Sequence, residues 1–280
     1  MSVADGARLV ALAAIWGASF LFMRITAPVI GAVATADGRM LIAGAALVAY
    51  FALAGFDAQW RRWWRYYALI GVLNSAAPFL LYAYSALELS VGLMAVMNAT
   101  SPMWGAALSA LILHERLSAG GIAGLMLGIA GVAILTGPQG SSASWLSIAA
   151  ALGAAVCYGL TGTVLRRWAR DTSARGMAVG TQVMGGVLLL PLVVVSPPPL
   201  PGTSVVLSML ALGLVCGALG YLLYFRLIAD IGATGALTVT YLIPVFGLVW
   251  GALFLGEPLS ATMIAGAVIV VAGTVLVLRG

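Results

Sequence analysis

The stretch PMWGAALSALILHERLSAGGIAGLMLGIAG at residues 102–131 occurs a second time, as PVFGLVWGALFLGEPLSATMIAGAVIVVAG at residues 244–273. Aligned without a gap, the two stretches are identical at 14 of 30 positions. The identical positions include the pairs Pro102/Pro244, Glu115/Glu257 and Ser118/Ser260. The offset is 142 residues, about half of the 280-residue chain. Internal similarity at a fixed offset indicates a duplicated structural unit.

The same offset pairs similar residues far outside these stretches, with no insertion. The pairs include Arg24/Arg166, Gly71/Gly213, Tyr82/Tyr224 and Glu88/Asp230. Chance matches are frequent in a chain rich in Ala, Gly and Leu, so the inference depends on the ungapped register. It predicts one copy in residues 1–138 and a second in residues 143–280, joined by the Gly/Pro/Ser-rich segment 137–144.

The composition is typical of a polytopic membrane protein. Hydrophobic residues make up 63% of the chain and charged residues 8%, with a mean hydropathy of +1.12. A soluble domain carries about 25% charged residues, so this chain lacks the polar surface of a soluble globule. The net charge of +5 comes from 13 arginines and no lysine, which suits anionic lipid headgroups and not nucleic acid. The expected environment is therefore a lipid bilayer.

Ten apolar runs are long enough to cross a bilayer, which takes about 20 residues. They lie near residues 8–27, 31–55, 65–86, 89–113, 118–136, 145–166, 175–195, 204–228, 232–255 and 260–278. Turn-forming residues such as those at 197–199 and 256–258 separate them. We predict an all-α integral membrane protein with ten transmembrane helices.

The arginines orient the chain in the membrane. With ten spans, both termini and every second loop share one side, and that side carries eleven of the 13 arginines. Arg24 and Arg39 are the other two. This predicts that both termini are cytoplasmic. Because each copy has an odd number of spans, the second copy must run opposite to the first, which gives the inverted repeat of many secondary transporters.

Several of these residues form a familiar pattern. They are Trp16-Gly17 with Phe20, Arg39, Pro102 with Glu115-Arg116-Leu117-Ser118 and Gly124, and Pro244 with Leu255-Gly256-Glu257-Pro258-Leu259-Ser260, Gly266 and Gly273. The pattern resembles the EamA-type drug/metabolite transporter superfamily over essentially the whole chain. It departs from that family at His114, where Gly is usual, and at Tyr158, where Trp is common.

The resemblance implies a ten-helix carrier of a bacterial inner membrane, with a central cavity between helices 1–4 and 6–9. The fifth and tenth helices are implied to lie to the side. Members of the superfamily export amino acids and other metabolites, and nucleotide-sugar or sugar-phosphate antiporters form a related branch.

Arg39 is the first candidate for a functional role, because a charge inside a span costs about 2.5–3.5 kcal/mol on insertion scales. Counting back from Gly55 at the helical rise places it about 24 Å from that end, in the outer third of the bilayer. Two interpretations stay open: Arg39 reaches the outer headgroups, or it lies in the cavity and binds a substrate carboxylate. Asp37 does not share its helix face and is expected at the outer interface.

The fourth run carries Met94, Asn98 and Ser101 at helical spacing, followed by Pro102. A polar face must point to protein or water and not to lipid. Pro102 frees the backbone carbonyl of Asn98, so we expect a bend that offers this carbonyl to a cavity. A static kink with interhelical hydrogen bonds is the alternative. The second copy repeats the arrangement with Thr240, Tyr241 and Pro244.

Aromatic rings and amides in the other runs can form an apolar binding wall with a few hydrogen-bonding groups. The expected substrate-binding residues are Trp16, Ser19, Arg39, Asn74, Tyr82, Met94, Asn98, Tyr158, Gln182, Tyr224, Thr240 and Tyr241, and the expected hinges are Pro78, Pro102 and Pro244. Glu115 and Glu257 are expected to cap the helices that follow them; the family match offers a role in coupling as the alternative. The small residues of 120–131 favour close helix packing or a homodimer through the fifth and tenth helices.

The leading hypothesis is a secondary carrier that exports an amino acid or related metabolite by alternating access. A nucleotide-sugar or drug antiporter of the same superfamily is one alternative; a membrane-embedded enzyme and a non-transporting receptor or scaffold are others. The one histidine, His114, lies at a membrane edge, and no His/Cys/Asp cluster has metal-ligand spacing. We therefore expect no catalytic residue, metal or cofactor.

Overall fold

The computed structural model describes residues 2–137, 143–168 and 171–279. Within these ranges every regular element is a helix, and ten stretches are long and apolar enough to cross a membrane. This confirms the predicted all-α class with ten candidate spans. Most of the predicted linker, residues 138–142, lies outside the described residues.

Six of these ten spans are single helices. They are α1 (Val3–Ile30), α2 (Ala32–Leu53), α7 (Ala119–Thr136), α8 (Trp145–Arg167), α9 (Ala174–Val195) and α13 (Ala261–Arg279). The third, fourth, eighth and ninth spans are interrupted. They are built from α3 (Trp60–Gly71), η1 (Val72–Ala76) and α4 (Ala77–Ser85); α5 (Val91–Asn98) and α6 (Ser101–Leu113); and α10 (Thr203–Leu210), η2 (Ala211–Leu219), α11 (Gly220–Leu237) and α12 (Val239–Leu255). The repeat offset pairs the third span with the eighth and the fourth with the ninth, so the interruptions occur in equivalent spans of the two copies.

Two of the spans begin earlier than the apolar runs indicate. α1 starts at Val3, because Ser2 and Asp5 form a reciprocal capping box before the first apolar turn. α3 starts at Trp60, in a segment rich in Arg and Trp that is strongly amphipathic. The hydropathy of that segment is low, so a search for apolar runs does not include it. Trp and Arg are nevertheless common at the interface between membrane and water.

The third and eighth spans each contain a π-helical segment. The offset of 142 carries η1 onto residues 214–218, which lie inside η2. π-helical turns are rare and occur often at functional sites. η1 places Ser75 in the interior of the molecule with the half-buried Asn74 beside it, and η2 places Cys216 in the interior.

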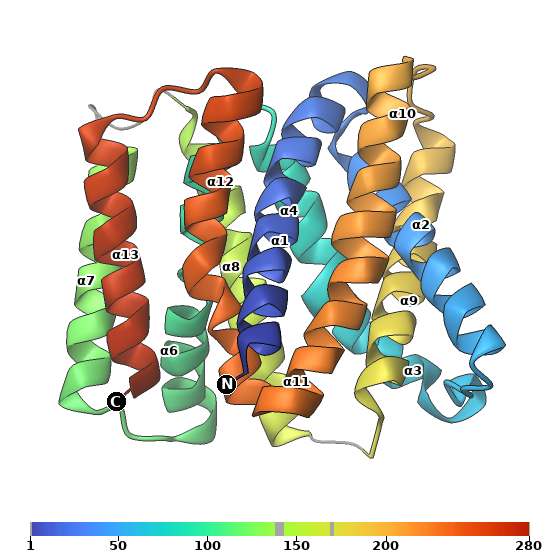
Figure 1. Cartoon of the computed structure of the whole chain (residues 1–280), viewed down its shortest axis with the longest axis horizontal. Coiled ribbons are helices and arrows are strands. Elements are labelled where there is room, and N and C mark those ends of the chain that lie inside the picture. Colours follow the sequence, from blue (N-terminus) through green and yellow to red (C-terminus); the bar gives the residue numbers. More distant parts are fainter. Residues whose placement is uncertain (1, 138–142, 169–170, 280) are drawn as a thin grey trace.

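α7 and α13 form a pair at one edge of the bundle (Figure 1), as the resemblance implies. Glycines allow their backbones to approach: a Cβ on Gly124 would lie 2.5 Å from the carbonyl oxygen of Gly273, and one on Gly131 would lie 3.1 Å from that of Gly266. The glycine stripe is therefore used for packing within the chain. A homodimer through the outer faces of these two helices stays a prediction.

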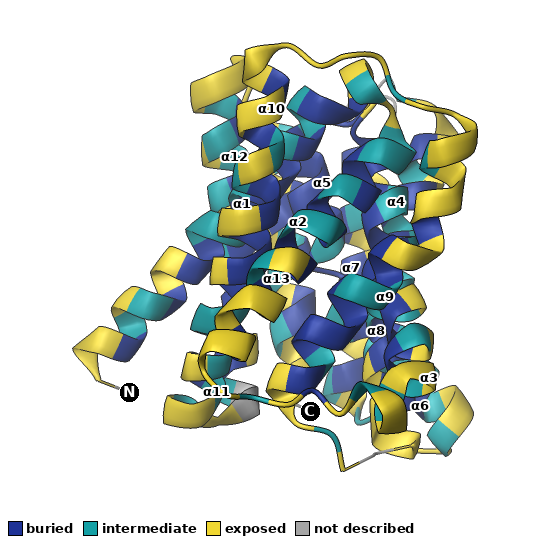
Figure 2. Ribbon diagram, turned by 90° about the vertical axis from the view of Figure 1, so that its right-hand side faces the viewer, coloured by how far each residue is buried: buried dark blue, intermediate teal, exposed yellow. Residues whose placement is uncertain are grey.

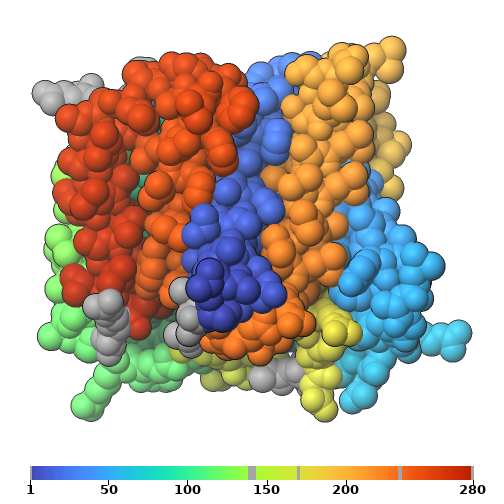
Figure 3. All heavy atoms as spheres, in the orientation of Figure 1, coloured from blue at the N-terminus to red at the C-terminus, as the bar shows by residue number. Residues whose placement is uncertain are grey.

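α1 begins and α13 ends at the same end of the bundle, which we call the terminal end; the opposite end is the far end (Figure 1). Buried residues line the interior, and exposed residues lie on the outside (Figure 2). Many exposed side chains are apolar, such as Leu111 at 73% and Val195 at 84%, as lipid contact requires. Side chains of α1 fill the space between α12 and α10–α11 (Figure 3).

Candidate functional site

Tyr82 is the centre of a first group of predicted residues. Its hydroxyl donates to Oδ1 of Asn98 at 3.2 Å, which joins α4 to α5. The Tyr82 ring meets Phe20 edge-on with centroids 5.2 Å apart, and the Tyr158 centroid lies 6.3 Å away. Three residues predicted from separate spans, Tyr82, Asn98 and Tyr158, are thus brought together.

A second group surrounds the side chain of Gln182. Its Nε2 donates to Oγ of Ser75 at 2.9 Å and to the hydroxyl of Tyr221 at 3.2 Å. Asn74 lies beside the same hydroxyl. The π-helical η1 of the first half and α9 and α11 of the second half meet at these contacts.

Trp16 extends the second group with aromatic contacts. Its ring centroid lies 5.2 Å from that of Tyr224 and 6.4 Å from that of Tyr221. The repeat offset relates the Trp16–Tyr224 pair to the Tyr158–Tyr82 pair. Equivalent positions of the two copies therefore make equivalent ring contacts, one pair in each group.

Arg39 lies near both groups. Its guanidinium carbon is 3.7 Å from the centroid of the Phe79 ring, a cation–π contact. It is close enough to the hydroxyls of Tyr158 and Tyr221 to act on them electrostatically. Arg39 is 6% exposed, which favours the inward-facing interpretation over contact with headgroups. Asp37, expected at the outer interface, is buried as well.

Two buried polar atoms of this region have no hydrogen-bond partner among the described residues: Nε of Arg39 and Oε1 of Gln182. The buried hydroxyl of Ser19 lies beside the thiol of Cys216. Buried polar groups are nearly always paired in native proteins, so a polar ligand would satisfy what the chain leaves open. We call the two groups, together with Arg39 and Ser19, the central cluster. It consists of Trp16, Ser19, Arg39, Asn74, Ser75, Phe79, Tyr82, Asn98, Tyr158, Gln182, Tyr221 and Tyr224.

The fourth span is interrupted at Pro102, as expected, but the details differ. α5 ends at Asn98 and α6 begins at Ser101. The Ser101 hydroxyl donates to the Asn98 carbonyl oxygen at 2.6 Å, a common local bond. This carbonyl thus has a partner within the chain, and its expected role in a cavity stays a prediction. Met94 is fully buried in the main hydrophobic core, which also contains Tyr82 and Phe79; its contact with a substrate stays a prediction.

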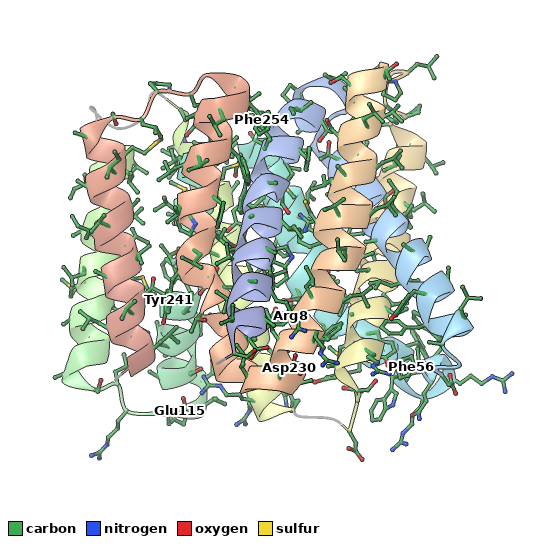
Figure 4. The ribbon with its side chains drawn as sticks, in the orientation of Figure 1. Arg8, Phe56, Glu115, Asp230, Tyr241 and Phe254 are labelled. Carbon is green, nitrogen blue, oxygen red and sulfur yellow. The ribbon has the colours of Figure 1, made fainter. Side chains whose placement is uncertain are left out.

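The remaining predicted residues mark interruptions of the spans. Pro78 lies in the first turn of α4, directly after η1, and Pro244 lies inside α12. The hydroxyl of Thr240 donates to the carbonyl of Leu237 at 2.8 Å, next to the break between α11 and α12. Tyr241 follows in the first turn of α12 (Figure 4).

Ser75, Phe79 and Tyr221 belong to the central cluster but were not predicted. The repeat contained a signal for two of them, because the offset pairs Phe79 with Tyr221. The two residues of that pair are both aromatic but not identical, so a search for identical residues does not find them. Phe79 has no polar group, and nothing in the sequence marks it as the ring under Arg39.

Glu257 does not cap the helix that follows it, which corrects the expectation from sequence. Its Oε1 and Oε2 accept from the backbone N–H of Val91 at 3.0 and 2.9 Å, at the start of α5 in the other half. Ser260 caps α13 instead. Glu257 thus meets the N-terminus of α5 in place of that of α13. Among the described residues, Glu115 pairs with Arg166 at 3.1 Å.

The chemistry of the central cluster is that of an organic ligand site: rings, amides, hydroxyls and one guanidinium. In the described part of the chain, no group of three or more His, Cys, Asp and Glu residues could hold a metal ion.

Ten apolar helices and a buried polar cluster at interrupted spans define the class as a polytopic α-helical membrane protein. Its family follows from comparison with known families. The chain belongs to the EamA-like transporter family, whose model matches residues 6–137 and again residues 145–279.

Known proteins resemble the chain over nearly its whole length. It is 27% identical to a chloroplastic WAT1-related protein of Arabidopsis thaliana, over 94% of this chain and 66% of that protein. It is 25% identical to a "Probable terminal-alkyne amino-acid exporter" of Streptantibioticus cattleyicolor, over 94% of this chain and 90% of that protein. A solved crystal structure aligns with a TM-score of 0.65 at 19% identity, over 97% of this chain and 96% of its own. That likeness shows a shared fold.

Proposed function

We propose that the protein is a secondary carrier that exports an amino acid or a closely related carboxylate-bearing metabolite by alternating access. The observation that supports this most directly is Arg39, a guanidinium 6% exposed that stacks on Phe79 and forms no ion pair with any described residue. A buried charge is costly unless it is paired. A substrate carboxylate would supply the missing counter-charge through charge-assisted hydrogen bonds.

The other members of the central cluster suit the rest of such a molecule. The unpaired Oε1 of Gln182 is an acceptor for an ammonium group. The rings of Trp16, Tyr158 and Tyr224 offer flat apolar contact to a side chain. The named amino-acid exporter among the relatives supports the same substrate class.

Alternating access would rock the two halves, residues 1–138 and 143–280, about the central cluster. The interruptions at Pro78, Pro102 and Pro244 are the expected bending points. The excess of arginine on one side supports a bacterial inner-membrane protein with both termini cytoplasmic.

Efflux from proteoliposomes loaded with a mixed amino-acid pool tests this function. We expect protein-dependent efflux of at least one amino acid, followed by mass spectrometry. Arg39→Ala should abolish efflux without loss of folding, whereas Arg62→Ala, at an exposed interfacial arginine, should leave it unchanged.

The same assay separates the alternatives. If no amino acid leaves the liposomes in a protein-dependent way, the amino-acid class is discarded, and a pool of nucleotide sugars tests the antiporter alternative. An enzyme would change the composition of the pool without moving it across the membrane. A scaffold would give no flux with any pool, and Arg39→Ala would change nothing.

A further inference from the structure

Asp37, in the second turn of α2, is a carboxyl group that the described residues leave without a partner. It is 3% exposed, its Oδ1 has no hydrogen-bond donor, and it takes part in no ion pair. The other described carboxylates accept a hydrogen bond or face solvent: Asp5, Asp57, Glu88, Glu115, Asp171, Asp230 and Glu257. Burying an unpaired ionised carboxylate is far more costly than burying its neutral form. The protonated acid therefore fits this environment.

No charged neighbour offsets that cost. α2 packs against α1, α4, η1, α9, α10 and η2. Its C-terminal half also contacts α11. The charged or titratable side chains on these elements and on α2 are Asp5, Arg8, Arg24, Arg39, Tyr50, Tyr82, Tyr84, Arg175, Cys216, Tyr221, Tyr224, Arg226 and Asp230. None of them forms a hydrogen bond or an ion pair with Asp37.

Asp37 lies along the contact between α2 and α9. It precedes Leu41 by one turn on the same helix face. Leu41 packs on Gly186 of α9, where a Cβ would lie 2.6 Å from its Cδ2. One turn further, Gly44 lies against Val183. α2 belongs to the first half of the chain and α9 to the second, so Asp37 lies where the halves meet.

We infer that Asp37 is a proton-binding site that couples transport to a proton gradient. It is protonated in the conformation described here, and it ionises when movement between α2 and α9 admits water. The carboxylate takes a proton from water on one side of the membrane, and the acid returns it to water on the other side. One proton therefore crosses per cycle, opposite to the substrate. This inference rests on the proposed carrier function.

The first test is the protonation of Asp37 itself, which needs no transport. Infrared spectra of the purified protein at neutral pH should show a carbonyl band of a buried protonated carboxylic acid. Asp37→Asn should remove that band, whereas Asp171→Asn, at an exposed carboxylate, should not. Because Asn resembles the neutral acid in shape, Asp37→Asn should fold and unfold at a temperature no lower than the wild type. If no band depends on Asp37 at neutral pH, the inference is wrong.

The second test is coupling in proteoliposomes. An imposed pH gradient, acid outside, should accelerate efflux of the transported amino acid several-fold. Asp37→Asn should lose this acceleration and keep exchange between equal concentrations, because the neutral side chain still allows the halves to close. Asp37→Glu, which restores a titratable group, should keep part of the response and covers the case that the asparagine variant fails to fold.

The outcomes separate the two proposals. Wild-type flux that ignores the gradient, or a full gradient response in Asp37→Asn, overturns proton coupling and leaves the carrier function standing. A complete absence of flux contradicts the carrier function and with it the coupling. In that case the infrared band alone decides whether Asp37 binds a proton.

Discussion

The two ends of the bundle are held by different kinds of contact. At the terminal end, Arg8 pairs with Asp230 at 2.8 Å, and Glu115 pairs with Arg166 at 3.1 Å (Figure 4). The side chains of Glu115 and Arg166 are 49% and 54% exposed. Exposed ion pairs of this kind contribute about 0–1 kcal/mol.

At the far end, charged side chains bind backbone groups. Arg24 donates to the carbonyl oxygens of Ala86 and Leu87 at 2.9 and 3.0 Å. Glu257 accepts from the N–H of Val91, the first residue of α5, directly after the same connection from α4. Hydrogen bonds to charged groups contribute about 1.5–3 kcal/mol when they are sheltered. Each of these far-end contacts is therefore expected to stabilise the fold more than the exposed Glu115–Arg166 pair does.

The equivalent glutamates Glu115 and Glu257 have different helix residues at matching positions, Ser109 and Gly251. Gly251 leaves room for the Glu257 carboxylate, since a Cβ there would overlap Oε2 of Glu257. The offset pairs Gly251 with Ser109. The Ser109 hydroxyl lies 3.0 Å from Oγ1 of Thr163 and also contacts Arg166. Identical glutamates in matching loops thus take different partners, and the equivalent helix residues, Gly251 and Ser109, differ as well.

The largest expected effect comes from Gly251→Ser, which gives the second half the residue of the first. The new side chain should displace Glu257 and leave the Val91 N–H without its acceptor. We expect a loss of about 2–4 kcal/mol in stability, from overpacking and the lost hydrogen bonds. Thermal unfolding in detergent, followed by tryptophan fluorescence, measures it.

Ser109→Gly is the matched control, expected to cost about 1 kcal/mol through the lost contact to Thr163. The double variant Gly251→Ser/Glu257→Ala should cost less than the sum of its parts, because both changes remove the same contact. Strict additivity would show that Gly251 does not act through Glu257.

The second prediction compares the glutamates directly. Glu257→Ala should cost about 1–3 kcal/mol, because the Val91 N–H loses a half-buried acceptor. Glu115→Ala should change stability by less than about 1 kcal/mol, since it removes an exposed pair. Glu257→Gln should retain much of the wild-type stability, because the amide oxygen can still accept from Val91. Equal effects of the two alanine variants would contradict the difference between the ends.

The third prediction concerns the residue before each glutamate. His114 and Gly256 both adopt the left-handed conformation, with φ of 56° and 65°. This conformation costs a side chain about 1–2 kcal/mol and glycine almost nothing. His114→Gly should therefore raise stability by about 1 kcal/mol, and Gly256→Ala should lower it by a similar amount. A lower unfolding temperature for His114→Gly would contradict this account.

The ten spans could be predicted because each needs about 20 apolar residues, and turn-forming residues separate them. The interruption at Pro102 could be predicted from the missing N–H of proline. η2 could not, because the residues of 211–219 contain no proline and read as an ordinary apolar helix.

Some residues of the candidate site could be predicted from the sequence, and others could not. Tyr82, Asn98 and Gln182 stand out as polar groups within apolar runs, whereas the ring of Phe79 does not. For Arg39, counting residues gives its depth in the membrane but not the face it occupies. Glu257 bonds to a residue 166 positions away, and no local pattern reports such a contact.

The smallest expected effect is a difference in pH dependence between two carboxylates of the far end. Burial raises the pKa of Glu257 above its usual value, although N–H groups of Val91 and Gly92 and the charge of Arg24 act against this. Hydrogen bonds from Ser144 lower the pKa of Glu88; the N–H of Ser144 donates to Glu88 at 2.7 Å.

The two shifts have opposite consequences for stability. The folded state holds the Glu257 proton more tightly, so its contribution is lost as pH rises through the window between the usual and the raised pKa. The contribution of Glu88 is present above its usual pKa and is lost as pH falls towards the lowered one. Unfolding temperatures of Glu257→Gln and Glu88→Gln, each compared with the wild type from about pH 3 to pH 7, should therefore change with opposite slopes, Glu88 below its usual pKa and Glu257 above its own. Parallel slopes would mean that the two carboxylates share one environment, and that burial does not raise the pKa of Glu257.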